Sequence, residues 1–177
     1  FSREALLGHV WGSDRVGDNR RRPVMVWLHG GGFRNGSGST PVLDGSSLAQ
    51  SQDVVVVTLN HRLNVFGFTY LAQAIGSDFA ESGTVGMMDL VVALEWVRDN
   101  IGRFGGDPGL VTIFGQSGGG RKVATLMAMP SAKGLFHRAI IESGATLKLV
   151  EREQAAVVAR ELLTTLDIPA ARFRELQ

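Results

Sequence analysis

Hydrophobic residues along the chain fall into short unbroken runs that alternate with longer, helix-spaced patterns. Four runs rich in Val, Ile and Leu predict buried strands, at residues 23–28, 54–58, 110–114 and 138–141. Strands that are apolar on both faces and separated by helices are typical of a mostly parallel sheet with helices covering it. We therefore expect an α/β fold.

Three segments carry the spacing of helices, residues 87–101, 121–129 and 151–166. In the first segment, the apolar residues that share one face are Leu90, Leu94, Val97 and Ile101. In the last, the expected apolar stripe is Ala155, Val158, Leu162 and Leu166. Two acidic residues of the first helix, Asp89 near its start and Glu95 on its flank, are expected to cap it or to face solvent.

Composition narrows the class of protein. With 177 residues, 44% of them apolar, the chain is long enough to bury a core, and no apolar run is long enough to span a bilayer. A net charge of +1 gives no electrostatic case for a nucleic-acid or membrane-surface partner. The absence of Cys excludes disulfides and favours a reducing compartment without establishing one. Because residue 1 is Phe1, we expect an internal piece of a longer protein, and its localisation and oligomeric state stay open.

Glycine is the unusual component, with 23 residues, or about 13% against a usual ~7%. Two glycine clusters each follow a predicted strand: His29-Gly30-Gly31-Gly32 and Gly115-Gln116-Ser117-Gly118-Gly119. In parallel sheets, active groups lie beyond the carboxyl ends of the strands. Both clusters are therefore expected at the functional edge of the sheet.

The second cluster matches G-x-S-x-G, the nucleophile elbow. A strand that turns sharply into a helix can expose a serine hydroxyl only if the residues two positions away lack bulk, and Gly115 and Gly119 meet that need. At a helix N-terminus, Ser117 would also lie near a positive dipole end. The sequence predicts a nucleophilic serine here.

The first cluster supplies what such a serine needs. Attack on an ester carbonyl creates an oxyanion, and amides of Gly31 and Gly32 could approach it without side-chain obstruction, together with the amide of Gly118. Phosphate binding is the rival interpretation of glycine loops. It is disfavoured because Arg121 and Lys122 stand where a P-loop needs Lys and Ser or Thr, and no G-x-G-x-x-G occurs.

At these residues the chain resembles the type B carboxylesterase family, the α/β-hydrolases that include cholinesterases and bacterial aryl and alkyl esterases. Strings in the family's order carry the resemblance, among them residues 26–33, 44–46, 60–63, 66–68, 86–89, 93–97, 104–108, 111–115 and 135–140. The resemblance implies that residues 1–177 form part of one α/β-hydrolase domain, an N-terminal and incomplete portion of its sheet. It also implies a small-molecule carboxylic ester as substrate and no metal or organic cofactor.

By the same resemblance, Ser117 is the nucleophile, Gly31, Gly32 and Gly118 are the oxyanion donors, and the supporting residues are His29, Gly30, Gln116 and Ser143. Two positions depart from the family, which usually has Glu-Ser-Ala at the elbow. Gln116 keeps the shape of Glu without its charge. Gly118 keeps the amide but gives the backbone more freedom.

The serine needs a base and an acid that orients it. His137 is the only histidine after Ser117, but it precedes a strand and so belongs at the amino edge, roughly 17–20 Å from the elbow at ~3.3 Å per strand residue. We therefore expect His137 to be structural. Asp107 is excluded as the acid on the same ground.

Three other residues stay open as triad members. His29 and His61 belong at the carboxyl edge but precede the serine, and we interpret them first as loop residues. Glu142 ends a strand at the correct edge and is the candidate acid within the chain. Ser143 is expected to hydrogen-bond near the site rather than to attack.

The leading hypothesis is a serine carboxylic-ester hydrolase that forms an acyl-enzyme, with its acid and histidine outside these 177 residues. The fragment alone is then expected to be inactive. The alternative is a non-catalytic binding or adhesion module on the same scaffold, which the retained Ser117 disfavours.

Overall fold

The structure, a computed structural model, describes residues 8–12 and 20–176. Its centre is a five-stranded sheet in the order β1-β3-β2-β4-β5. The strands are β1 (His9–Trp11), β2 (Arg22–Leu28), β3 (Val55–Thr58), β4 (Gly106–Gln116) and β5 (Arg138–Glu142). Only β1 pairs antiparallel with its neighbour, and β3, β2, β4 and β5 are parallel. The expected mostly parallel sheet is confirmed.

The α-helices are α1 (Ser46–Gln52), α2 (Asn64–Phe68), α3 (Ala72–Ile75), α4 (Val85–Asn100), α5 (Gly118–Ala128) and α6 (Arg152–Thr165). Short 3₁₀ helices lie at Pro41–Leu43, Ser77–Phe79, Ser82–Thr84, Ile101–Phe104, Pro130–Ala132 and Ala170–Leu176. Within the described ranges, none of these helices has the length and hydrophobicity needed to cross a membrane.

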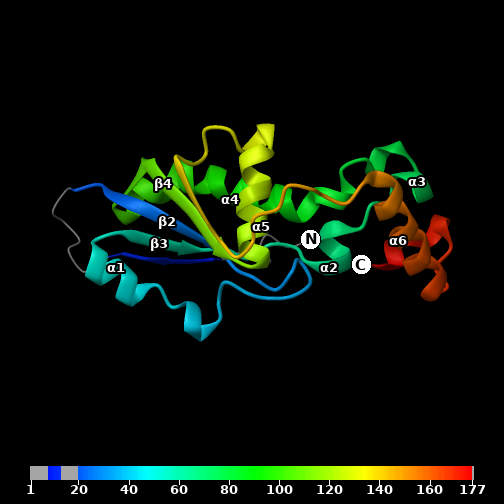
Figure 1. The fold of residues 1–177 in the computed structure, drawn as a ribbon, viewed down its shortest axis with the longest axis horizontal. Helices are drawn as coiled ribbons and strands as arrows, with labels where there is room; N and C mark the ends of the chain where they lie inside the picture. The colour runs from blue at the N-terminus through cyan, green and yellow to red at the C-terminus, as the bar shows by residue number, and fades with distance from the viewer. Residues whose placement is uncertain (1–7, 13–19, 177) are drawn as a thin grey trace.

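Helices lie on both faces of the sheet (Figure 1). On one face α4 and α5 bury the larger core, to which the alternating residues Val24, Val26 and Leu28 of β2 contribute. On the other face α1 packs Ala49 against Val56 of β3. The alternation of side chains along each strand therefore supplies two separate cores, as expected for a sheet buried on both sides.

Helix α4 follows its predicted hydrophobic face. Leu90, Leu94 and Val97, with Ile101 just beyond the helix, are completely buried. The expectation for Asp89 is wrong, because its side chain is buried rather than exposed or capping. An ion pair with Arg62, described below, makes that burial possible.

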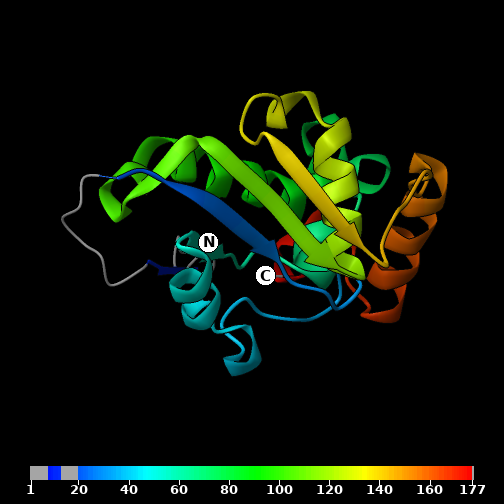
Figure 2. The ribbon, with the colours of Figure 1, turned by 60° about the vertical axis from the view of Figure 1, so that its left-hand side comes forward.

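Helix α6 lies beyond the end of the sheet, beside α3, in both views (Figures 1 and 2). The predicted apolar stripe is wrong by one position, because the buried residues are Ala156, Ala159 and Leu163. Two residues of the predicted stripe, Val158 and Leu166, are exposed. Helix α6 contacts α3, and its buried face carries two small alanine side chains and Leu163.

The strands that carry the two glycine clusters end together. Leu28 of β2 pairs with Gly115 of β4, and Gln116 of β4 pairs with Glu142 of β5. The arrowheads of β2, β4 and β5 accordingly point to one edge of the sheet (Figure 2). Strand β4 is longer than predicted and begins at Gly106, directly after Gly105, which has a left-handed φ of 78°.

Candidate active site

Ser117 occupies the bend between β4 and α5. Its φ of 55° and ψ of −118° lie outside the regions that residues with side chains normally adopt, which costs of order 1–3 kcal/mol. Hydrogen bonds hold the bend: the Ser117 amide donates to the Glu142 carbonyl at 2.8 Å, and the Ser117 carbonyl accepts from the Arg121 amide at 3.0 Å. The side chain is exposed. The chain therefore presents the hydroxyl at a strained strand-to-helix turn, outside any regular helix.

The elbow touches the first glycine cluster directly. A Cβ on Gly118 would lie 2.5 Å from the amide nitrogen of Gly32, too close for any side chain. A Cβ on Gly30 would lie 3.8 Å from the Ser117 Cβ and 3.7 Å from Oε1 of Gln116. Glycine at 118, where the resembling family usually has alanine, thus lets the two backbones approach more closely than a methyl group would permit.

The loop after β2 is bent by consecutive left-handed residues. The φ angles are 94° at Gly31, 61° at Gly32 and 66° at Phe33. The Gly31 carbonyl accepts from the amides of Arg34 and Asn35, which closes the turn. Within the described part of the chain, the amides of Gly31 and Gly32 donate to no residue. These amides are therefore available to a bound oxygen atom.

Two stacked histidines lie behind this loop. The rings of His29 and His61 are 5.0 Å apart and nearly parallel, and both residues are buried. Nδ1 of His29 bonds the Gly30 carbonyl at 2.8 Å, while each Nε2 has no partner among the described residues. Burial and the nearby Lys122 charge lower the pKa of His29, and the same two causes lower that of His61 to about 3. Neither imidazole bonds to Ser117, and the lowered pKa values favour the neutral form of both rings.

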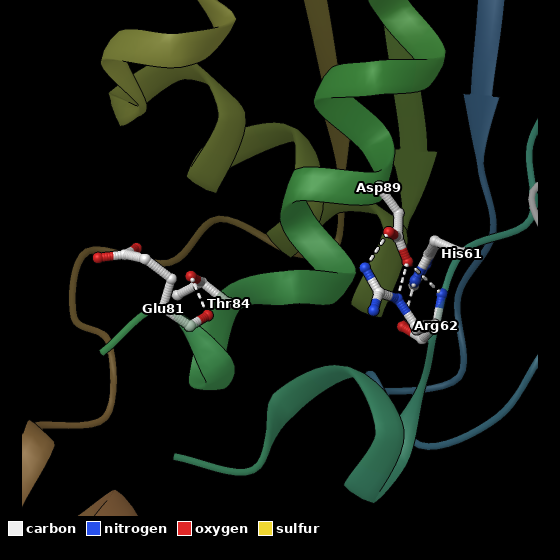
Figure 3. A network of polar contacts seen from close by, with 5 residues as sticks. All are labelled: His61, Arg62, Glu81, Thr84 and Asp89. Carbon is white, nitrogen blue, oxygen red and sulfur yellow. Dashed lines mark hydrogen bonds and ion pairs between the residues drawn. The ribbon is translucent and has the colours of Figure 1, made fainter. Parts of the chain in front are cut away.

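A partly buried ion pair holds the segment that carries His61 (Figure 3). Arg62 donates from Nε and an η nitrogen to the two oxygens of Asp89, at 2.8 and 2.6 Å, and from its amide at 2.9 Å. The carboxylate raises the pKa of Arg62. This bidentate arrangement ties the loop after β3 to α4, and the helical spacing around Asp89 did not reveal it.

Lys122 of α5 reaches the same region from the other side. It is completely buried and donates from Nζ to the His29 carbonyl at 2.8 Å. Burial lowers its pKa to about 7. A signal for this residue existed in the sequence, because Lys122 lies one helical turn before Leu126 on the apolar face of α5.

The remaining predicted residues lie as follows. His137 is at the amino end of β5, where Nδ1 accepts from the Val111 amide at 3.2 Å, so its structural role agrees with the prediction. Asp107 lies at the same edge and accepts from the Gly109 amide. Glu142 lies at the carboxyl edge, and its backbone carbonyl accepts the hydrogen bond from the Ser117 amide. Ser143 follows with a φ of 50°, and its hydroxyl makes no hydrogen bond within the described residues.

No histidine completes a triad in these residues. All four histidines of the sequence lie in the described ranges, and none bonds to the Ser117 hydroxyl. Residues 8–12 and 20–176 also hold no group of three or more His, Asp or Glu side chains arranged to bind a metal ion.

Comparison with known proteins agrees with this geometry. The model of the carboxylesterase family matches residues 8–176, and the chain belongs to that family. It is 47% identical to the para-nitrobenzyl esterase of Bacillus subtilis over 175 residues, which are 99% of this chain and 35% of that protein. It is 48% identical to carboxylesterase 1D of Rattus norvegicus over 147 residues, 83% of this chain and 25% of that one.

Solved structures show the same fold. A carboxylesterase of Geobacillus stearothermophilus superimposes with a TM-score of 0.90 at 43% identity, over 98% of this chain and 36% of its own. These neighbours confirm the α/β-hydrolase fold. The chain spans about a third of the length of the bacterial esterases that it matches.

Proposed function

We propose that this protein is a serine carboxylic-ester hydrolase that works through an acyl-enzyme. The observation that carries the proposal is the contact between the elbow and the glycine loop, in which Gly118 lies against Gly32 and Ser117 stands exposed at the bend. A nucleophilic hydroxyl beside unbonded amides is the arrangement that acyl transfer requires.

In the proposed reaction, the Ser117 oxygen attacks the ester carbonyl and forms a carbon–oxygen bond, while its proton passes to a base. The carbonyl oxygen becomes an anion that accepts hydrogen bonds from the amides of Gly31, Gly32 and Gly118. Collapse expels the alcohol, which takes up the proton and leaves an acyl group on Ser117. Water then attacks this ester by the same route and releases the acid.

The base and its acid partner are proposed to lie outside residues 1–177. The support is that no histidine bonds to Ser117 and that related esterases are about three times as long. Residues 1–177 alone are expected to hydrolyse a simple aryl ester at close to the uncatalysed rate, because a serine without a base is a weak nucleophile at neutral pH. Turnover by the isolated chain that Ser117→Ala abolishes would contradict this part of the proposal.

The proposal is tested by replacing Ser117 with Ala in the protein at its full natural length. We expect kcat for a para-nitrophenyl ester to fall by at least about 10⁴-fold, since the covalent route is lost. Ser131→Ala, at an exposed serine after α5, is the control and should retain full activity. Full activity in Ser117→Ala would refute the mechanism, and no activity in the unaltered protein would favour a binding module instead.

A further inference from the structure

Among the residues that the structure describes, the largest completely buried side chain is that of Lys122. Its Nζ has one hydrogen-bond partner among the described residues, the carbonyl of His29, and lies 5.5 Å from the centre of the Phe33 ring. No carboxylate in the described ranges lies within ion-pair distance of it. A buried cation without a counter-charge is costly, so its presence needs a reason beyond packing.

Lys122 connects the two halves of the proposed oxyanion hole. It belongs to α5, the helix that begins at Gly118, and helical side chains lean toward the N-terminus of their helix. Its ammonium group therefore reaches back to the residue that opens the glycine loop. The carbonyl that it holds lies two residues before Gly31, and the ring beside it belongs to the residue after Gly32.

The groups around Lys122 do not share its charge. The lowered pKa values of His29 and His61 favour their neutral forms, and the Arg62 guanidinium meets the Asp89 carboxylate at 2.6 and 2.8 Å. The ammonium group of Lys122 therefore lies in surroundings without an opposite charge among the described residues. There, its hydrogen bond to the His29 carbonyl is stronger than a hydrogen bond between two uncharged groups would be.

We propose that Lys122 is a positioning residue for the oxyanion hole, which fixes the amides of Gly31 and Gly32 against Gly118 by holding the His29 carbonyl. The inference rests on the proposed esterase function and deepens it. Without this anchor the strained loop can relax away from the elbow, and a displacement of about 1 Å at such a site can cost 10²-fold in rate.

The test is Lys122→Met in the full-length protein, because Met keeps the length of the side chain and removes the donor and the charge. Active sites are counted by titration with a fluorophosphonate, so that misfolded molecules do not enter kcat. We expect kcat per titrated site to fall about 10²-fold while KM changes less than threefold. Lys133→Met, the same change at an exposed lysine, is the matched control and should leave both constants unchanged.

A second measurement separates positioning from packing. A trifluoromethyl ketone adds to the serine hydroxyl and places an oxyanion in the hole, so its affinity reports the same donors as the transition state. For Lys122→Met this affinity should fall by the same factor as kcat/KM. Lys122→Gln keeps a neutral donor. Its kcat per titrated site and its affinity for the ketone should therefore lie between those of the wild type and Lys122→Met.

Two results would overturn the inference: kcat per titrated site within threefold of wild type, or a lower kcat with unchanged affinity for the ketone. If Lys122→Met yields no titratable sites, Lys122→Gln decides by the same criteria. If only the inference about Lys122 is wrong, the activity of the wild-type protein still depends on Ser117. If the esterase proposal is wrong, the activity does not depend on Ser117.

Discussion

Two basic residues lie near the stacked histidines, Arg62 and Lys122, and their surroundings shift their pKa values in opposite directions. Arg62 is partly buried and meets both oxygens of Asp89, and its pKa is raised. Lys122 is completely buried and meets a carbonyl and an aromatic face, and its pKa is lowered. The first arrangement stabilises the charge, and the second costs free energy at neutral pH.

The two residues hold different parts of the molecule. Arg62 supports the fold, and Lys122 contacts the proposed site. The Arg62–Asp89 pair joins the loop after β3 to the core helix α4 (Figure 3). Lys122 instead bonds to the first residue of the glycine loop. In the role that we propose for Lys122, a buried charge that weakens the fold holds the strained glycine loop in place, so that stability and activity oppose each other at this residue.

The largest effect on stability is expected from breaking the paired site. Asp89→Ala should lower the free energy of unfolding by about 3 kcal/mol, because the partly buried Arg62 guanidinium and the Arg62 amide lose three hydrogen bonds to the buried carboxylate. Urea denaturation of the full-length protein measures the change. Asp99→Ala, at the exposed Arg98–Asp99 pair, is the control and should leave the unfolding midpoint in place. Equal effects of the two substitutions would contradict the structural role of Asp89.

A smaller effect of opposite sign is expected at the unpaired site. Lys122→Met should raise the free energy of unfolding by about 2 kcal/mol at pH 7, because it removes an uncompensated buried charge. The folded pKa of about 7 lies below the ordinary 10.5, so between these values the unfolded chain binds more protons than the folded one. The free energy of unfolding of the wild type therefore rises with pH through this group. The difference in free energy of unfolding between Lys122→Met and the wild type should shrink from pH 7 to pH 10.5.

Denaturation midpoints of wild type and Lys122→Met across this pH range measure that difference. Lys133→Met should show none. A difference that stays constant with pH, or a variant less stable than wild type at pH 7, would contradict an unpaired buried ammonium.

The sequence predicted those features that depend on local spacing. The buried face of α4 through Leu94 and Val97 followed from helical periodicity, and the bend at Ser117 followed from flanking glycines. The position of His137 at the opposite edge followed from strand direction alone.

Features set by contacts between distant segments escaped prediction. Asp89 is buried because Arg62, from another loop, supplies two hydrogen bonds to its carboxylate. Lys122 is buried because a carbonyl 93 residues earlier accepts a hydrogen bond from its Nζ. The buried face of α6 is set by packing at Ala156 and Ala159, where small side chains gave a weaker hydrophobic signal than Val158.

Covalent labelling tests most directly whether Ser117 is the attacking group. Full-length protein treated with a fluorophosphonate should gain one adduct, which peptide mass spectrometry locates on Ser117, and esterase activity should fall in proportion to labelling. Loss of activity with the adduct on another residue, or with Ser117 unmodified, would contradict the account.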